Sequence, residues 1–114
     1  MTLENIAWIV GVHLGTMHES QAEWAKKLKS PLRIRRIYQA RSICYLVLYE
    51  ARGVSYTEIA ELFQRAQSVI SRSLHWARDW AKENPEKWAA IQESVKASME
   101  AEQEAHAAAT NLKV

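Results

Sequence analysis

The sequence is poor in cysteine, glycine and proline, and it contains no long apolar run. Its single cysteine, Cys44, can form neither an internal disulfide nor a cysteine-based zinc site. Three glycines and two prolines in 114 residues leave few turn-forming residues, which argues against a β sandwich or barrel. No apolar run approaches the ~18–20 residues of a membrane span, and the first residues lack the basic segment of a signal peptide. We therefore expect a soluble, cytoplasmic protein with no membrane partner.

Helix-forming residues dominate what remains, and their apolar periodicity predicts an all-α domain of five or six helices. Hydrophobic residues at 48% and charged residues at 25% are ordinary values for a folded chain and exclude wholesale disorder. Helices are predicted over residues 2–14, 19–29, 32–52, 55–63, 67–82 and 85–108. We divide them into an N-terminal helical segment, a central core and a C-terminal helical tail, with bounds at 1–30, 31–83 and 84–114.

Individual residues mark several of these helix ends. Gly53 is a natural C-terminal stop for the long helix that precedes it. Ser55, followed three residues later by Glu58, has the spacing of a capping box. Asn84 and Pro85 predict that a helix restarts, with asparagine as the N-cap and proline at the first helical position.

The net charge of +2 hides an uneven distribution of charge along the chain. Residues 1–25 carry three acidic residues and no Lys or Arg, and residues 83–114 have a net charge of −3. Residues 26–82 carry twelve basic residues against four acidic ones, a local charge of +8. Such a block indicates a polyanionic partner, and the alternative is a solvated basic face. Its acid-free run comprises Lys26, Lys27, Lys29, Arg33, Arg35, Arg36 and Arg41.

Residues 56–75, YTEIAELFQRAQSVISRSLH, have the organisation of a helix-turn-helix: a short helix, a three-residue connector and a second helix. Ala60 lies where the two helices would cross most closely, so a larger side chain would push them apart. Gln64 takes the turn position that glycine usually holds, and it would have to adopt a positive φ or make a different turn. The positions expected to face inward are Ile59, Phe63, Val69, Ile70, Leu74 and Ala77.

This stretch resembles the helix-turn-helix of phage repressors and Cro-type regulators, at Ala60, Phe63, Gln67, Ser68 and Ile70. A longer stretch, Arg35–Trp76, resembles the C-terminal DNA-binding domain of the bacterial replication initiator DnaA, in the Trp-repressor-like superfamily. The residues that carry this second resemblance are Arg36, Ala40, Arg41, Ser55, Glu58, Ile59 and Phe63. The chain lacks that family's histidine-containing signature and has a shorter connector, so the family's target specificity is not carried over. Both resemblances imply a DNA-binding domain of phage, mobile-element or bacterial type.

We therefore predict a sequence-specific regulator of transcription or replication that binds double-stranded DNA and is not an enzyme. Hydrogen-bonding side chains on the outer face of the second helix would read base edges: Gln67, Ser68, Ser71, Arg72 and His75. Basic and hydroxyl side chains near them would contact phosphates: Arg33, Arg35, Arg36, Arg41, Thr57 and Arg65. No pattern in the sequence indicates a metal, a cofactor or a catalytic centre.

A competing function and an oligomeric state complete the expectations. In the competing function the chain is a helical protein–protein interaction module without DNA binding, and its partner contacts a stripe of Tyr38, Tyr45 and Tyr49. For the DNA-binding function we expect a homodimer, because a single helix-turn-helix reads too few bases to be selective. The apolar stripes that could form its interface are Leu3, Ile6, Val10 and Leu14 near the N-terminus, or Trp88, Ile91, Val95 and Met99 in the C-terminal helix.

Overall fold

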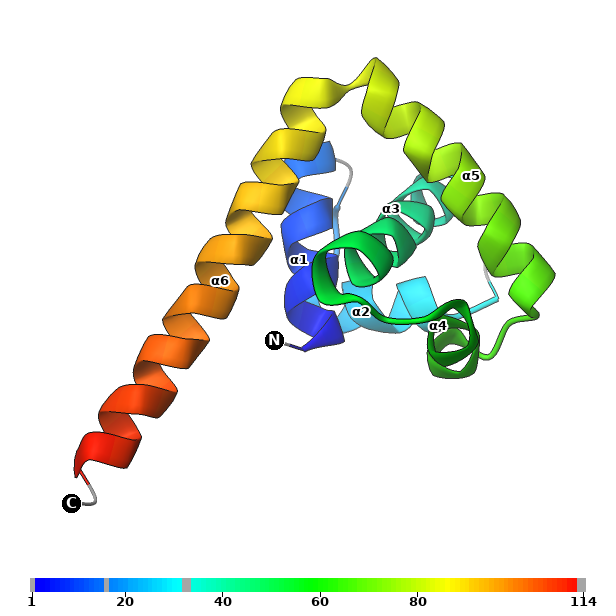
Figure 1. Cartoon of the computed structure of the whole chain (residues 1–114). Coiled ribbons are helices and arrows are strands. Elements are labelled where there is room, and N and C mark those ends of the chain that lie inside the picture. Colours follow the sequence, from blue (N-terminus) through cyan, green and yellow to red (C-terminus); the bar gives the residue numbers. More distant parts are fainter. Residues whose placement is uncertain (1, 16, 32–33, 113–114) are drawn as a thin grey trace.

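A computed structural model describes residues 2–15, 17–31 and 34–112 of the chain. This part of the chain folds into six α-helices and contains no strand, which confirms the predicted all-α class. The C-terminal half of α6 extends beyond the other helices (Figure 1). The helices are α1 (Leu3–Leu14), α2 (Gln21–Lys29), α3 (Arg35–Arg52), α4 (Tyr56–Phe63), α5 (Gln67–Glu83) and α6 (Pro85–Leu112).

The central element is α3, which contacts all five other helices. Its residues from Ala40 to Leu48 are all buried, including Cys44. The core around α3 also contains Ile6 of α1, Leu74 of α5 and Ile91 of α6, each at most 1% exposed. The N-terminal segment, the central segment and the C-terminal tail therefore share one hydrophobic core.

Most of the predicted helix ends are confirmed. Gly53 ends α3 in the left-handed conformation, with φ of 65°. The Ser55 hydroxyl accepts a hydrogen bond of 3.2 Å from the backbone N–H of Glu58 at the start of α4. Pro85 is the first residue of α6, as predicted, but the side-chain amide of Asn84 donates to the Trp80 carbonyl at 3.0 Å. The Asn84 side chain thus satisfies an unpaired carbonyl at the end of α5.

The start of the chain is fixed to α3 through Glu19, which lies just before α2. The carboxylate of Glu19 accepts hydrogen bonds from Arg36 of α3 and from Lys27 of α2. Only 6% of the Glu19 side chain is exposed. These bonds hold the pKa of the Glu19 carboxyl well below its usual range, chiefly through Arg36. The ion pairs help to place α1 and α2 against the first turn of α3, where Arg36 lies.

Candidate nucleic-acid interface

The connector between α4 and α5 makes a tight turn. Gln64 has φ of 52° and ψ of 51°, which confirms one of the two alternatives expected for this position. The backbone N–H of Arg65 donates to the carbonyl of Ala60 at 2.9 Å, which closes the end of α4. This turn fixes the direction in which α5 leaves α4.

A shared apolar contact holds the two helices against α3. Ile59, Ala60 and Phe63 of α4 are buried, as are Ile70, Leu74 and Ala77 of α5. The ring of Phe63 meets Tyr45 of α3 edge to face, with 4.7 Å between the ring centroids. These positions confirm the predicted inward set with one exception. Val69 is 39% exposed, because the buried side of α5 is centred on Ile70 and Leu74 and Val69 lies at its edge.

The five predicted base-reading side chains all lie on the exposed side of the first half of α5. These residues are Gln67, Ser68, Ser71, Arg72 and His75. The opposite side of the same turns is buried through Ile70, Ser73 and Leu74. The amide of Gln67 donates to the Thr57 hydroxyl at 3.0 Å, which joins the starts of α4 and α5. The first half of α5 therefore presents a polar face that is free of acidic residues up to Asp79.

The predicted phosphate-binding residues fall into different environments. Arg35, at the start of α3, and Thr57, in the first turn of α4, are exposed. Arg65 is half-buried in the connector, and its guanidinium donates to the carbonyl of Ser30. Arg33 lies outside the described residues. Thr57 and Arg65 thus lie beside the start of α5, and Arg35 is exposed at the start of α3.

Arg36 and Arg41 are engaged inside the chain. Arg36 binds the Glu19 carboxylate through two nitrogens, and its guanidinium carbon lies 5.8 Å from the centre of a Trp24 ring. Arg41 is only 6% exposed, and it donates to the carbonyls of Leu28 and Ser30 at 2.7 and 2.8 Å. Burial lowers the pKa of Arg41 from its usual value. The structure does not bring these two guanidinium groups onto the exposed face of α5.

A cavity of about 470 Å³ opens beside that face, between α3, α5 and the chain that precedes α3. Three of its lining residues are arginines: Arg41, Arg65 and Arg72. The other described lining residues are Pro31, Tyr38, Tyr45, Val69 and Ser73. Sequence spacing could not reveal this site, because the residues come from four separate parts of the chain. The sequence predicts DNA contacts for its three arginines and a partner surface for Tyr38 and Tyr45, but it does not predict that these side chains share one cavity.

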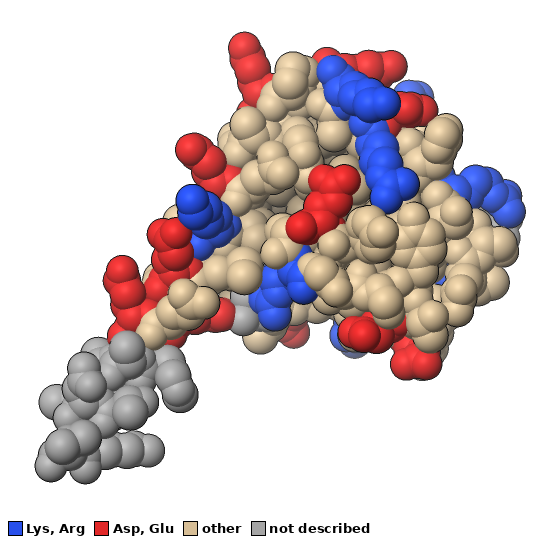
Figure 2. All heavy atoms as spheres, in the orientation of Figure 1, with Lys and Arg blue, Asp and Glu red and all other residues tan. Residues whose placement is uncertain are grey.

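The exposed charge of α6 has the opposite sign. Its described side chains include five exposed glutamates and two exposed lysines. Acidic groups predominate along this helix in the space-filling view (Figure 2). The acidic residues of α6 are Glu86, Glu93, Glu100, Glu102 and Glu104, and its lysines are Lys87 and Lys96. A polyanion would therefore be repelled from α6 and attracted to the arginines around α5.

The described part of the chain offers neither a metal site nor a membrane-spanning helix. No group of three or more His, Cys, Asp or Glu side chains could hold a metal ion there. No described helix has the length and apolar character needed to cross a membrane. Comparison of the chain with protein-family models, curated proteins and solved structures finds no match. The function is therefore inferred from the structure of the chain itself.

Proposed function

We propose that the chain binds double-stranded DNA sequence-specifically, with the first half of α5 in the major groove. The observation that carries this proposal is the placement of the five polar side chains from Gln67 to His75. All five are exposed on one side of α5, whose other side is buried against α3 and α4. Gln can pair bidentately with adenine and Arg with guanine, each contributing ~1–3 kcal/mol of discrimination against a wrong base.

Residues around α5 supply the sequence-independent part of the proposed interface. The short helix α4, the turn at Gln64 and α5 support a helix-turn-helix, in which the first helix crosses the DNA backbone. Thr57 lies at the start of α4, within hydrogen-bonding distance of Gln67. Together with Arg35 and Arg65, it would contact phosphates and set the register. We leave Arg36 and Arg41 out of this set because their guanidinium groups bind the chain itself.

Such binding would make the chain a regulator of transcription or replication that acts on the nucleoid in the cytoplasm. The competing function, a helical interaction module, would use the exposed tyrosines. Tyr38 and Tyr49 are each 37% exposed, but Tyr38 packs on Trp76 and Tyr49 packs on Tyr56. Tyr45 is buried. The predicted stripe is therefore not one continuous exposed surface, which favours the DNA-binding function.

The proposal is tested by selecting a preferred site from random duplex DNA with the full chain. Affinities for that site and for a random duplex are then compared for the parent, for Gln67→Ala and for Arg72→Ala. We expect each variant to lower the ratio of specific to random affinity by roughly tenfold, because each loses a base contact. Lys82→Ala is the matched control, since Lys82 is an exposed basic residue at the far end of α5.

Two results would contradict the proposal. In the first, the chain selects no site, and its retention on duplex DNA does not fall steeply as the salt concentration rises. Binding to DNA phosphates releases counterions and therefore requires a steep fall. The other is a ratio that stays unchanged in both variants, which would place recognition elsewhere on the chain. The first result would favour the interaction module.

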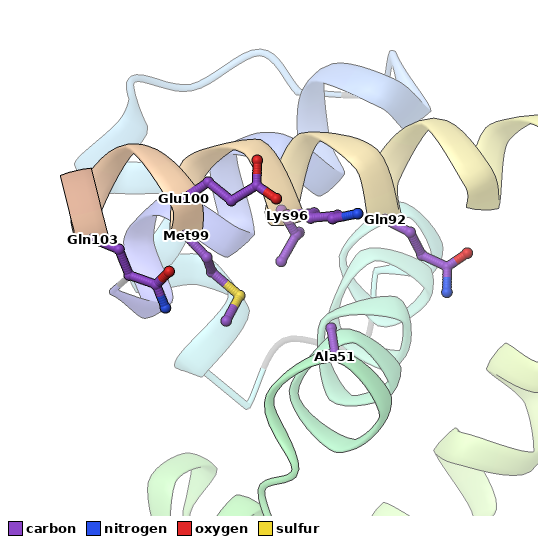
Figure 3. A pocket seen from close by; sticks show the side chains of 7 residues that line it. Ala51, Gln92, Lys96, Met99, Glu100 and Gln103 are labelled. Carbon is purple, nitrogen blue, oxygen red and sulfur yellow. The ribbon is translucent and has the colours of Figure 1, made fainter.

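We further propose that the chain acts as a homodimer through α6. Two of the residues first considered for this interface, Ile91 and Val95, are buried in the core of the single chain, and so are Ile6 and Val10 of α1. A groove of about 320 Å³ between α6 and the end of α3 stays open in the single chain. Met99 and Ala51 lie in this groove, with Gln92, Lys96 and Glu100 along α6 (Figure 3). In the dimer, α6 of a second copy would cover this groove. The two copies of α5 would then lie at separate places along one duplex.

A further inference from the structure

The cavity beside α5 combines positive charge with a buried hydroxyl that completes no hydrogen bond. Its three arginines come from α3, from the connector and from α5, and no described residue that lines it is acidic. Tyr45 lines the same cavity and is 1% exposed. Within the described chain, the Tyr45 hydroxyl is the one buried side-chain polar group that completes no hydrogen bond, although the Arg65 guanidinium lies close enough to oppose part of the rise in its pKa. A buried hydroxyl without a partner is costly, so its presence needs an explanation.

Two of the arginines face this cavity from different directions. Arg65 is anchored through one nitrogen to the Ser30 carbonyl, which fixes its guanidinium at the rim. Arg72 is exposed and comes from the second turn of α5. Arg41 lies deeper, where it donates to the Leu28 and Ser30 carbonyls. Arg41 and Arg65 are therefore held in place by backbone carbonyls, and Arg72 is the more adaptable charge.

We propose that this cavity is a binding site for an oxyanion of the phosphate class, held by Arg65 and Arg72 and completed by the Tyr45 hydroxyl. Planar guanidinium groups match phosphate oxygens in geometry as well as in charge. Burial raises the pKa of Tyr45, so its hydroxyl keeps the proton that it would donate to an anion. A cation is disfavoured by the arginines, and a purely apolar ligand would leave both the hydroxyl and the guanidinium groups unsatisfied.

The phosphate can come from two sources. One is a free phosphate ion or phosphate ester in solution, which requires no DNA. The other is a phosphate of the DNA backbone, and this second source rests on the function proposed above. In that case Arg65 and the Tyr45 hydroxyl would seat one backbone phosphate beside α5, and Arg72 would turn to a base edge; a free anion would be held by all three.

The first arm of the test uses the full chain and inorganic phosphate, with chloride at the same ionic strength as the reference. We expect saturable NMR shifts centred on Arg65, Arg72 and Tyr45. Arg72→Gln should weaken phosphate binding about tenfold, because it removes a charge-assisted hydrogen bond. Tyr45→Phe should weaken it several-fold with little change of the Tm in chloride, since the hydroxyl has only its loose contact with Arg65 to lose. Lys87→Gln, an exposed change on α6, should leave phosphate binding unchanged.

The second arm measures the affinity of the parent and of Tyr45→Phe for a random duplex. A several-fold loss in the variant identifies a backbone phosphate as an occupant, because a buried Tyr45 cannot reach a base edge. Binding in the first arm with no loss in the second identifies a free anion as the occupant. If phosphate produces no more shift than chloride and Tyr45→Phe leaves duplex binding unchanged, the proposal is overturned. If the chain binds no DNA, the proposed function fails and the first arm alone decides on the anion site.

Discussion

The indole nitrogen of Trp24 donates a hydrogen bond of 2.7 Å to the carbonyl oxygen of Ala7, across the face of α1 that Gly11 leaves open. The Trp24 side chain is fully buried, and it is the largest residue that α2 contributes to the core. A methyl group added at Gly11 would lie 2.8 Å from this nitrogen and 3.0 Å from the sulfur of Met17. Glycine is therefore required in the middle of α1 by packing, although it weakens the helix.

Gly11→Ala should destabilise the fold. Alanine favours a helix over glycine by about 1 kcal/mol, but overpacking a buried site typically costs about 1–3 kcal/mol. We expect the packing cost to exceed the helix gain, with a net loss of about 1 kcal/mol in the free energy of unfolding. Chemical denaturation measures this value, and Val12→Ala on the exposed side of α1 is the control. A Gly11→Ala variant more stable than the parent would contradict the Trp24 packing.

Glu19→Gln should lower the Tm at neutral pH, because it weakens the attachment of α2 to α3. The variant keeps the size of the side chain but loses the charge that binds Arg36 and Lys27. The pKa of Glu19 is lowered in the folded chain, so its charge stabilises the fold above the usual carboxyl pKa of 4.5. That stabilisation is lost as the pH falls below this value.

The pH dependence supplies the check on Glu19. Thermal unfolding of parent and variant should differ at pH 7 and converge as the solution is made more acidic. Glu23→Gln, an exposed change in the first turn of α2, should follow the parent at each pH. A Tm difference that persists unchanged into strong acid would show that the Glu19 charge is not its source.

Arg35→Ala and Arg36→Ala should behave differently although the residues are adjacent. Arg35 is exposed, so its loss should weaken binding to all duplex sequences about equally and reduce the salt slope by about 0.9. Arg36 binds Glu19, so its loss should lower the Tm and leave the salt slope closer to that of the parent. Duplex affinity measured at several salt concentrations distinguishes the two. If Arg36→Ala reduces the salt slope by as much as Arg35→Ala does, Arg36 reaches DNA as well.

The dimer proposal predicts that the full chain sediments as a dimer at tens of micromolar. Gln92 and Gln103 are exposed and line the groove that the second α6 would cover. Changing both to glutamate should dissociate the dimer without lowering the Tm of the single chain, because neither residue lies in the core. Ala101→Glu combined with Ala105→Glu adds the same charge to the opposite side of α6 and serves as the control. A parent chain that is monomeric under these conditions would rule out the dimer.

Much of the local structure follows directly from the sequence. Gly53, Ser55 and Pro85 act within a few residues of their own position, because they set the backbone or pair with a neighbouring N–H. The apolar repeats that define the buried sides of α3 and α5 depend only on helical geometry. The exposure of Gln67 and Arg72 could be predicted for the same reason, since residues opposite a buried stripe face outward.

Charge pairing and burial across the chain were decided only by the tertiary structure. Arg36 belongs to a run without acidic residues, yet folding brings Glu19 to it from a position 17 residues earlier. Arg41 is buried although it is charged, because the carbonyls of Leu28 and Ser30, which precede α3, accept its hydrogen bonds. The cavity that joins Tyr45, Arg65 and Arg72 has the same origin. Hydrogen bonds and ion pairs form over a few ångströms in space, whatever the distance along the chain. The sequence therefore determined which side chains could form them. The packing of α3 against its neighbours determined which of them did.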